Sequence, residues 1–394
     1  MRHLRLAALL ILGLAGHQAQ AQEPILIGEI NSYSTLPAFT EPYRKGWQLA
    51  LGEVNAAGGR PIEVVSRDDG GKPAQALTAA NELVAREGVA LLMGTFFSNV
   101  GLAVADYAKR RNVFFLAAEP LTDAITLSQG NPETFRLRPS NSMQAAMLAE
   151  EAAKLPAKRW ASIAPNYEYG QSAVAVFKQI LVEKRPDVEW VAAQWPPQGK
   201  LDAGPVIQAI AAAKPEAILN VTFGADLAKL VREGETRGLF EGRSVVSFLT
   251  GEPEYLEPLG DEAPEGWIVT GYPWYAIDTP AHEAFLEAYE KAYGEHPKLG
   301  SVVGYTTMKA AAAILARAGS TDTGALIKAA EGIGVDSPFG PIVFRAVDHQ
   351  STLGAFVGRT AIKDGNGVMV DFAYRDGADY LPDEAEVKEL RPAD

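Results

Sequence analysis

Residues 89–120, VALLMGTFFSNVGLAVADYAKRRNVFFLAAEP, hold the pattern that decides the fold. Two short apolar runs, VALLMG at 89–94 and VFFLAA at 113–118, flank a segment with helical character. Apolar runs of this length between helical segments are typical of parallel strands that are buried on both faces. The stretch therefore predicts a strand, a helix and a second parallel strand, with the loop TFFSN at 95–99 leading into the helix.

The same alternation extends over most of the chain. It starts again after TFRLRPSNS at 134–142, which divides the chain into two similar halves. Further strands are predicted at 25–30 and 62–66, where burial on both faces is again expected, and at 160–166, 188–194, 216–222 and 244–249. Helices are predicted at 42–55, roughly 74–87, and near 169–184, 203–213 and 225–237. Because strands alternating with helices form parallel sheets, we expect an α/β protein with two doubly wound, Rossmann-like lobes in tandem.

The last third of the chain breaks this alternation. Residues 280–331 are helical in pattern, and KDGNG at 363–367 is a hairpin signal. Since these late segments must return to lobes that are already built, we expect the chain to cross between the lobes more than once. The expected division is 22–139 plus about 276–346 for the first lobe and 140–275 plus about 347–394 for the second.

The first residues indicate export. Arg2 and Arg5 precede a short apolar run that ends in AQA at 19–21, so we expect residues 1–21 to be a cleaved signal peptide. No later stretch approaches the ~20 apolar residues of a membrane helix, and a soluble mature protein is expected. The chain has no cysteine, so we expect a periplasmic protein without a lipid anchor. Its formal charge of -13 argues against nucleic acid and anionic membranes as partners.

The strand ends indicate where a ligand binds. In open parallel sheets, ligands bind beyond the carboxyl ends of the strands. Loops at these positions contain most of the candidate aromatic residues: Tyr33, Phe39, Phe96, Phe97, Tyr167, Tyr169, Phe223 and Tyr255. Two facing walls of aromatic and small polar groups predict a cleft for a small amphipathic molecule.

Several of these residues have a purely structural alternative. Ser98 precedes a helix expected to start near Val100, so its hydroxyl either caps that helix or helps to bind a ligand carboxylate. Phe96 and Phe97 either pack in the core or line the cleft. Glu252, like its neighbour Glu254, is either a solvated loop acid or part of the site.

Enzyme signatures are weak. The chain has no G-x-S-x-G, H-E-x-x-H, Walker or G-x-G-x-x-G motif. Beyond the signal peptide, its histidines are His282, His296 and His349, and they lack metal-ligand spacing. We therefore expect a binding protein with no catalytic residue, metal or cofactor. The alternative is a hydrolase or lyase, for which Glu252 is the one candidate acid.

Several longer stretches carry a resemblance to a known family. They are residues 25–69 and 89–120, TFRLRPSN, NYEYGQS, ILNVTFGADLAKLVREGETRGL, LTGEPEYLEPLGDEAPEGW and VDHQSTLGAFVGR. In order and spacing the chain resembles periplasmic solute-binding proteins of the branched-chain amino-acid ABC-importer type. The resemblance implies a type I periplasmic binding fold with three hinge crossings, which closes over one ligand and delivers it to a membrane permease.

The resemblance also assigns roles to residues. It implies that Ser98, with Asn99, and the backbone of Ala118 and Glu119 bind the carboxylate of an amino-acid ligand.

Across the cleft, the resemblance implies that the ligand's ammonium group binds Tyr167 or Tyr169 together with Glu252. The ligand side chain would pack against Tyr33 or Phe39.

Two features depart from the family pattern. The chain lacks a first-lobe disulfide, and Phe97 stands beside Phe96 where the family has a small residue before the serine. A more aromatic pocket makes an aromatic or hydrophobic carboxylate an alternative to an amino acid, and amides or urea remain further alternatives. The protein is expected to act as a monomer, with a ligand-presenting sensor as the alternative to a transport component.

Overall fold

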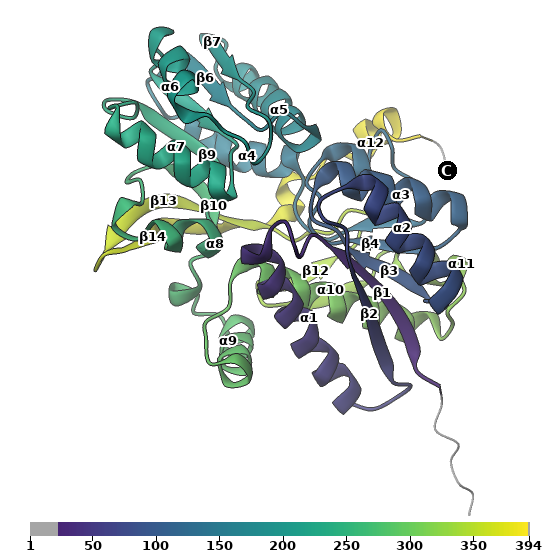
Figure 1. Ribbon diagram of the computed structural model, residues 1–394. Coiled ribbons are helices and arrows are strands. Elements are labelled where there is room, and N and C mark those ends of the chain that lie inside the picture. The colour runs from purple at the N-terminus through teal and green to yellow at the C-terminus, as the bar shows by residue number, and fades with distance from the viewer. Residues whose placement is uncertain (1–22, 393–394) are drawn as a thin grey trace, which may run out of the picture.

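The computed structural model describes residues 23–392, and Figure 1 shows two lobes in this part of the chain. The predicted signal peptide, residues 1–21, lies outside the described residues. Each lobe is built around one larger sheet, and a small two-stranded sheet completes the structure. The predicted α/β class is therefore confirmed.

The first sheet contains five parallel strands in the order β2-β1-β3-β4-β5. Its strands are β1 (Ile25–Asn31), β2 (Ile62–Asp68), β3 (Leu91–Gly94), β4 (Phe114–Ala117) and β5 (Thr134–Arg136). Its helices are α1 (Pro37–Ala56), α2 (Pro73–Glu82), which continues into the π-helical turn η1 (Leu83–Glu87), and α3 (Ser98–Arg111).

The sequence predicted β1 to β4 but not the three-residue β5. The expectation that β2 is buried on both faces is wrong, because β2 lies at the edge of the sheet and is mostly half-buried.

The second sheet repeats this winding and then extends it. Its order is β14-β13-β10-β9-β8-β6-β7, so β7-β6-β8-β9-β10 matches the order of the first sheet. Its strands are β6 (Arg159–Ile163), β7 (Glu189–Gln194), β8 (Ala217–Asn220), β9 (Ser244–Gly251), β10 (Ile268–Gly271), β13 (Ala355–Lys363) and β14 (Asn366–Arg375). Its helices are α4 (Asn141–Ala152), α5 (Glu168–Lys184), α6 (Ala203–Ala212), α7 (Gly224–Thr236) and α8 (Pro253–Leu256). The predicted hairpin is confirmed, because β13 and β14 are antiparallel around Asp364 and Gly365.

The remaining elements connect and cover the lobes. They are α9 (Pro280–Tyr293), α10 (Leu299–Ala318), α11 (Thr323–Ala330), β11 (Gly334–Ser337), β12 (Gly340–Val343), α12 (Glu384–Leu390) and the 3-10 turns η2 (Asp123–Ile125), η3 (Glu257–Glu262), η4 (Trp274–Ala276) and η5 (Gly377–Tyr380). Because α10 packs against α1 and β3, the chain passes between the lobes after β5, after β10 and before β13. After α12, Arg391 donates hydrogen bonds to the carbonyls of Thr126 and Asn131 at 2.8 and 2.9 Å.

One described helix, α10, is long and apolar enough to cross a membrane by length and composition. The expectation that no stretch after the signal peptide approaches the length of an apolar membrane helix is therefore wrong. Most of α10 is buried inside the protein, where it packs along α1. These contacts are typical of a core helix rather than a lipid-facing one.

Candidate ligand-binding site

The carboxyl ends of the two sheets meet at a narrow cavity of about 10 Å³, close to the space that one water molecule occupies. It is lined by Phe96, Ser98, Glu119, Leu121, Arg138, Tyr167, Tyr169, Phe223 and Leu249. In the first sheet β2 and β3 lie on opposite sides of β1, and in the second sheet β7 and β8 lie on opposite sides of β6. Folds of this class bind ligands at the point where the strand order reverses in this way. The loops after β3 and β4 supply one wall, and those after β6 and β8 supply the facing wall.

Aromatic rings from both lobes touch across the cavity. Phe96 and Phe223 lie 6.0 Å apart between ring centroids, and Phe97 and Tyr167 lie 6.1 Å apart edge to face. Tyr169 packs against Phe223 at 5.7 Å. Such contacts stabilise a closed arrangement of the lobes and form an aromatic wall of the cavity.

Ser98 does not cap α3. The helix begins at Ser98 rather than near Val100, and Phe97 occupies the capping position without a side-chain hydrogen bond to the helix. The Ser98 hydroxyl instead accepts a hydrogen bond from the Thr122 backbone N–H at 3.3 Å. The capping alternative is therefore wrong, because an earlier helix start places Ser98 inside the first turn, where its side chain lines the cavity.

A buried arginine joins two carboxylates at one side of the cavity. Arg138 donates to Glu119 Oε2 at 3.1 Å through Nη1 and to Glu252 Oε1 at 2.6 Å through Nη2. All three side chains are at most 5% exposed. Glu119 comes from the loop after β4 and Glu252 from the end of β9, so Arg138 links the two lobes.

The electrostatics of this triad are unusual. Burial raises the pKa of the Glu119 carboxyl to about 8, against the opposing effect of Arg138. Burial also raises the pKa of Glu252, again opposed by Arg138. Neighbouring Glu254 is buried too and accepts the Gly300 backbone N–H at 2.7 Å. Glu252 and Glu254 are therefore not solvated loop acids, because α10 and Arg138 cover them.

Sequence reasoning missed Arg138 as a site residue. It lies in TFRLRPSNS, which in the sequence pattern marks only the point where the alternation of strands and helices starts again. A usable signal was present, since Arg138 follows β5 and so stands at the carboxyl end of a parallel strand.

The other predicted residues lie around the cavity without lining it. The Tyr33 ring is covered by the Arg44 guanidinium, 3.7 Å from the ring centroid. Phe39 and Phe97 both pack against Phe96, with ring centroids 5.0 Å and 5.1 Å from the centroid of the Phe96 ring. Asn99 is half-buried on α3, Ala118 is buried after β4, and Glu252 faces Arg138.

The backbone is strained on both sides of the cleft. Thr95, after β3, has a φ of 65°, and Leu249, in β9, has a φ of 64°. Residues other than glycine adopt this left-handed region at a cost, and such positions concentrate at functional sites. Their placement at the carboxyl ends of β3 and β9, one in each lobe, supports a binding site there.

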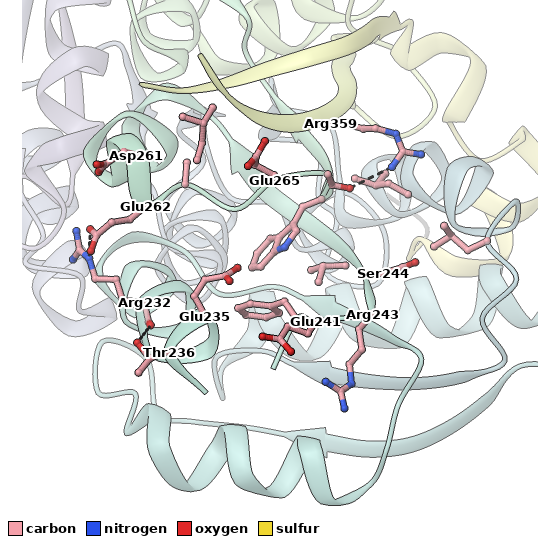
Figure 2. Close-up of a pocket in the computed structure, with 18 residues that line it drawn as sticks. Arg232, Glu235, Thr236, Glu241, Arg243, Ser244, Asp261, Glu262, Glu265 and Arg359 are labelled. Atoms are coloured by element: carbon pink, nitrogen blue, oxygen red, sulfur yellow. Dashed lines mark hydrogen bonds and ion pairs between the residues drawn. The ribbon is translucent and has the colours of Figure 1, made fainter. Parts of the chain in front are cut away.

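A larger open groove of about 670 Å³ lies elsewhere, between α7, η3 and the first residues of β9 and β10. Figure 2 shows Arg232 paired with Glu262 on one side of this groove and Arg359 on the other. The groove borders Ser244 and Ile268, at the amino ends of the strands. Ligands in this class of sheet bind at the opposite ends, so the groove is not the candidate site.

Metal binding has no support in the described part of the chain. Across residues 23–392, no group of three or more His, Cys, Asp or Glu side chains is arranged to hold a metal ion.

Comparisons with known proteins agree with this architecture. A family model described as "Periplasmic binding protein" matches residues 24–366. A relative from Brucella suis biovar 1 (strain 1330), "Leu/Ile/Val-binding protein homolog 7", is 26% identical over 352 residues, covering 84% of this chain and 87% of the relative.

Two solved structures share the fold, each with a TM-score of 0.80 and 22% identity. One is an ABC-transporter solute-binding protein from Rhodopseudomonas palustris BisB5 in complex with 3,4-dihydroxybenzoic acid, covering 90% of this chain and 98% of that chain. The other is an amino-acid ABC-transporter substrate-binding protein from Pseudomonas fluorescens Pf-5, and the match covers 93% of this chain and 99% of that chain. The family model spans most of the chain, and the two lobes share the same order of parallel strands. This chain therefore belongs to the periplasmic binding protein family.

Proposed function

We propose that this protein is the substrate-binding component of an ABC importer, which captures a small organic solute and delivers it to a membrane permease. The observation that carries the proposal is the cavity between the carboxyl ends of two doubly wound sheets, lined from both lobes. The Brucella relative named for leucine, isoleucine and valine supports the same role.

The side chains that line the cavity suit a small amphipathic ligand, either an amino acid or an aromatic or hydrophobic carboxylate, and the lobes would have to open around it. Phe96, Tyr167, Tyr169 and Phe223 offer the apolar walls. The Ser98 hydroxyl lies at the start of α3, where backbone N–H groups and the helix dipole favour a carboxylate. The printed ligand of the Rhodopseudomonas protein, 3,4-dihydroxybenzoic acid, is a carboxylate with an aromatic body.

Closure of the lobes is the proposed mechanism. We assign residues 22–139 with about 276–346 to one lobe and 140–275 with about 347–394 to the other. Membership of the two sheets supports this division. A ligand that touches both walls stabilises the closed state by its differential affinity for that state, and the closed lobes are then recognised by the permease.

The protein is proposed to work in the periplasm as a monomer after removal of residues 1–21. Its acidic composition, with a formal charge of -13, suits contact with basic loops of a permease.

A thermal-shift screen of amino acids, aromatic acids, short-chain carboxylates and amides tests the proposal. A ligand present at ~100 times its Kd adds about 2.7 kcal/mol to the free energy of unfolding. For the ligand found, Ser98→Ala and Phe223→Ala should each weaken binding about tenfold or more by calorimetry. Asn99→Ala, on the same helix but outside the cavity, is the matched control. Equal effects of Asn99→Ala and Ser98→Ala would contradict the proposed site.

A further inference from the structure

Three carboxyl groups are buried near one another where the lobes meet. Glu119, Glu252 and Glu254 are each at most 3% exposed, and the charges of Glu252 and Glu254 act on Glu119. Glu119 follows β4 of the first sheet, whereas Glu252 and Glu254 follow β9 of the second sheet. The three acids therefore come from both sides of the cleft.

A single arginine balances these acids. Within residues 23–392, Arg138 is the one cation that forms ion pairs with them, through Nη2 to Glu252 at 2.6 Å and through Nη1 to Glu119 at 3.1 Å. A guanidinium keeps its charge inside proteins. If all three acids were ionised, one negative charge would be balanced by Arg138 and two would be buried without a partner charge.

The other groups that face these acids within the described residues supply no balancing charge. Lys298 acts on Glu254, but its Nζ pairs with Glu257, 3.5 Å from Oε2. Buried tyrosines also surround the acids, and burial raises the pKa of each hydroxyl, so the tyrosines stay neutral at pH 7. They are Tyr43, Tyr169, Tyr255, Tyr272 and Tyr289.

Each acid has one oxygen without a hydrogen-bond partner in the part of the chain that the structure describes: Glu119 Oε1, Glu252 Oε2 and Glu254 Oε2. A buried, ionised oxygen without a donor is costly, whereas a protonated carboxyl group carries no charge. Glu252 has the shorter contact with Arg138, so it is the carboxylate that balances the guanidinium. The unpartnered oxygens of Glu119 and Glu254 are then the positions for two protons.

The pKa values of these two groups agree with this assignment. Burial raises the pKa of Glu119 and of Glu254 to about 8, and the charge of Glu252 raises the pKa of Glu254 further. In the closed structure both groups therefore hold a proton at pH 7. A glutamate in water, with its ordinary pKa of 4.5, holds almost none at that pH.

Contacts between the lobes keep these acids away from water. Arg138 joins Glu119 of one lobe to Glu252 of the other, and the Gly300 backbone N–H of α10 donates to Glu254 Oε1 of α8 at 2.7 Å. Separation of the lobes breaks these contacts and admits water to the carboxyl groups. Water stabilises the ionised form, so opening favours loss of the protons.

We propose that closure of the lobes takes up two protons from solvent, one on Glu119 Oε1 and one on Glu254 Oε2. Each proton forms an O–H bond as water leaves the acids, and both protons return to solvent when the lobes open. A ligand favours the closed state, so its binding is coupled to proton uptake. This inference rests on the proposed function.

Calorimetry at pH 7 counts these protons. Binding is measured in phosphate and in Tris, which differ in ionisation enthalpy, so a proton taken from the buffer appears as a difference in binding heat. The probes are benzoate, phenylacetate, leucine and phenylalanine, whose own charges do not change near pH 7. We expect the wild type to take up about two protons per bound probe, because both pKa values rise from 4.5 to about 8.

Glutamine variants assign the protons to residues. Glu119→Gln and Glu254→Gln should each remove about one proton from the uptake, and the double variant should remove both. Glu29→Gln is the matched control, because Glu29 is also fully buried and its pKa is also raised to about 8. Glu29 lies on β1 inside the first lobe, so the control should leave the uptake unchanged.

The affinity of the wild type gives a second readout that needs no variant. Because the closed state binds more protons than the open state, affinity should fall as pH rises between 4.5 and about 8. The fall should reach up to about tenfold per pH unit for each proton taken up.

Equal binding heats in the two buffers, or an affinity that does not change with pH, would overturn the inference and leave the proposed function standing. Uptake that survives in the double variant, or that Glu29→Gln abolishes, would overturn it as well. If none of the four probes binds, the proposed function fails and the inference falls with it.

Discussion

Glu29, on β1, is a buried carboxyl group outside the ligand cavity. Its Oε2 accepts a hydrogen bond from the Ser66 hydroxyl at 2.5 Å, while Oε1 has no hydrogen-bond partner in the described part of the chain. Burial raises the pKa of Glu29 to about 8, and the hydrogen bond from Ser66 opposes this effect only in part. The folded protein therefore holds a proton on Glu29 at pH values where the unfolded chain has lost it.

This proton makes stability depend on pH. Between the ordinary carboxyl pKa of 4.5 and about 8, the unfolded state binds fewer protons, so the free energy of unfolding should fall as pH rises. Glu29→Gln removes the share of this dependence that Glu29 contributes, while the raised pKa of Glu119 keeps its own share. Urea denaturation should find the variant more stable than the wild type at pH 8, by on the order of 2 kcal/mol.

The advantage of Glu29→Gln should shrink at pH 5. Glu63→Gln, an exposed position on the neighbouring strand β2, is the control and should leave the pH dependence as it is. Identical slopes against pH for the wild type and Glu29→Gln would contradict the assignment.

Among the elements, the pair of α1 and α10 depends on glycine for its close packing. A Cβ atom added to Gly304 of α10 would lie 2.0 Å from the Tyr43 carbonyl oxygen, and one added to Gly46 of α1 would lie 2.0 Å from the Ser301 carbonyl oxygen. Both obstacles are helix backbone, which cannot move without separating the helices. This close contact explains how an apolar helix of 20 residues becomes part of the core.

Gly304→Ala should therefore destabilise the protein by at least about 2 kcal/mol, a cost typical of overpacking in a core. Gly52→Ala, in the same packed pair but on the exposed face of α1, has no heavy atom within 4 Å of the new Cβ. It should stabilise the protein by roughly 0.5–1 kcal/mol, because alanine favours helix more than glycine does. Thermal and urea unfolding of the two variants measure both effects, and destabilisation of equal size would rule out the packing argument.

For the whole molecule, polar contacts beside the cavity join the lobes. Thr122 Oγ1, after β4, donates to Glu168 Oε1 at the start of α5 at 2.6 Å. Ser172 Oγ, on the same helix, donates to Asp123 Oδ2 at 3.2 Å. We call these two hydrogen bonds, Thr122 to Glu168 and Ser172 to Asp123, the latch between the lobes. The Thr122 backbone N–H also donates to the Ser98 hydroxyl, so the loop that carries Thr122 contacts a residue of the ligand cavity.

Thr122→Val should weaken this latch while keeping the shape of the side chain. One hydrogen bond to a charged group contributes about 1.5 kcal/mol or more, so ligand affinity should fall roughly tenfold, mainly through faster release. Stopped-flow kinetics measure the release rate, and small-angle scattering should show less compaction on ligand binding. Thr78→Val, on the surface of α2, is the control. Unchanged release from Thr122→Val would exclude the latch.

Much of the fold follows from local patterns in the sequence. Apolar runs such as VFFLAA, and the amphipathic segments between them, predict β4 and its neighbours. The reason is that the spacing of apolar residues along a short segment indicates both the type of element and the faces that it buries. The rule that ligands bind at carboxyl ends of parallel strands then placed Phe96, Tyr167 and Phe223 together before any contact was known. Local signals were enough for both results.

Other features were decided by tertiary structure alone. Arg138 and Glu252 are 114 residues apart, and their pairing depends on how the lobes close around the hinge. Within the first lobe, α1 places the Arg44 guanidinium over the Tyr33 ring, which removes Tyr33 from the predicted site. The sequence determined the strands, the helices and most of the aromatic wall, because each depends on neighbouring residues. Only the folded chain decided which buried charges meet and where the cavities lie, because those depend on contacts between distant segments.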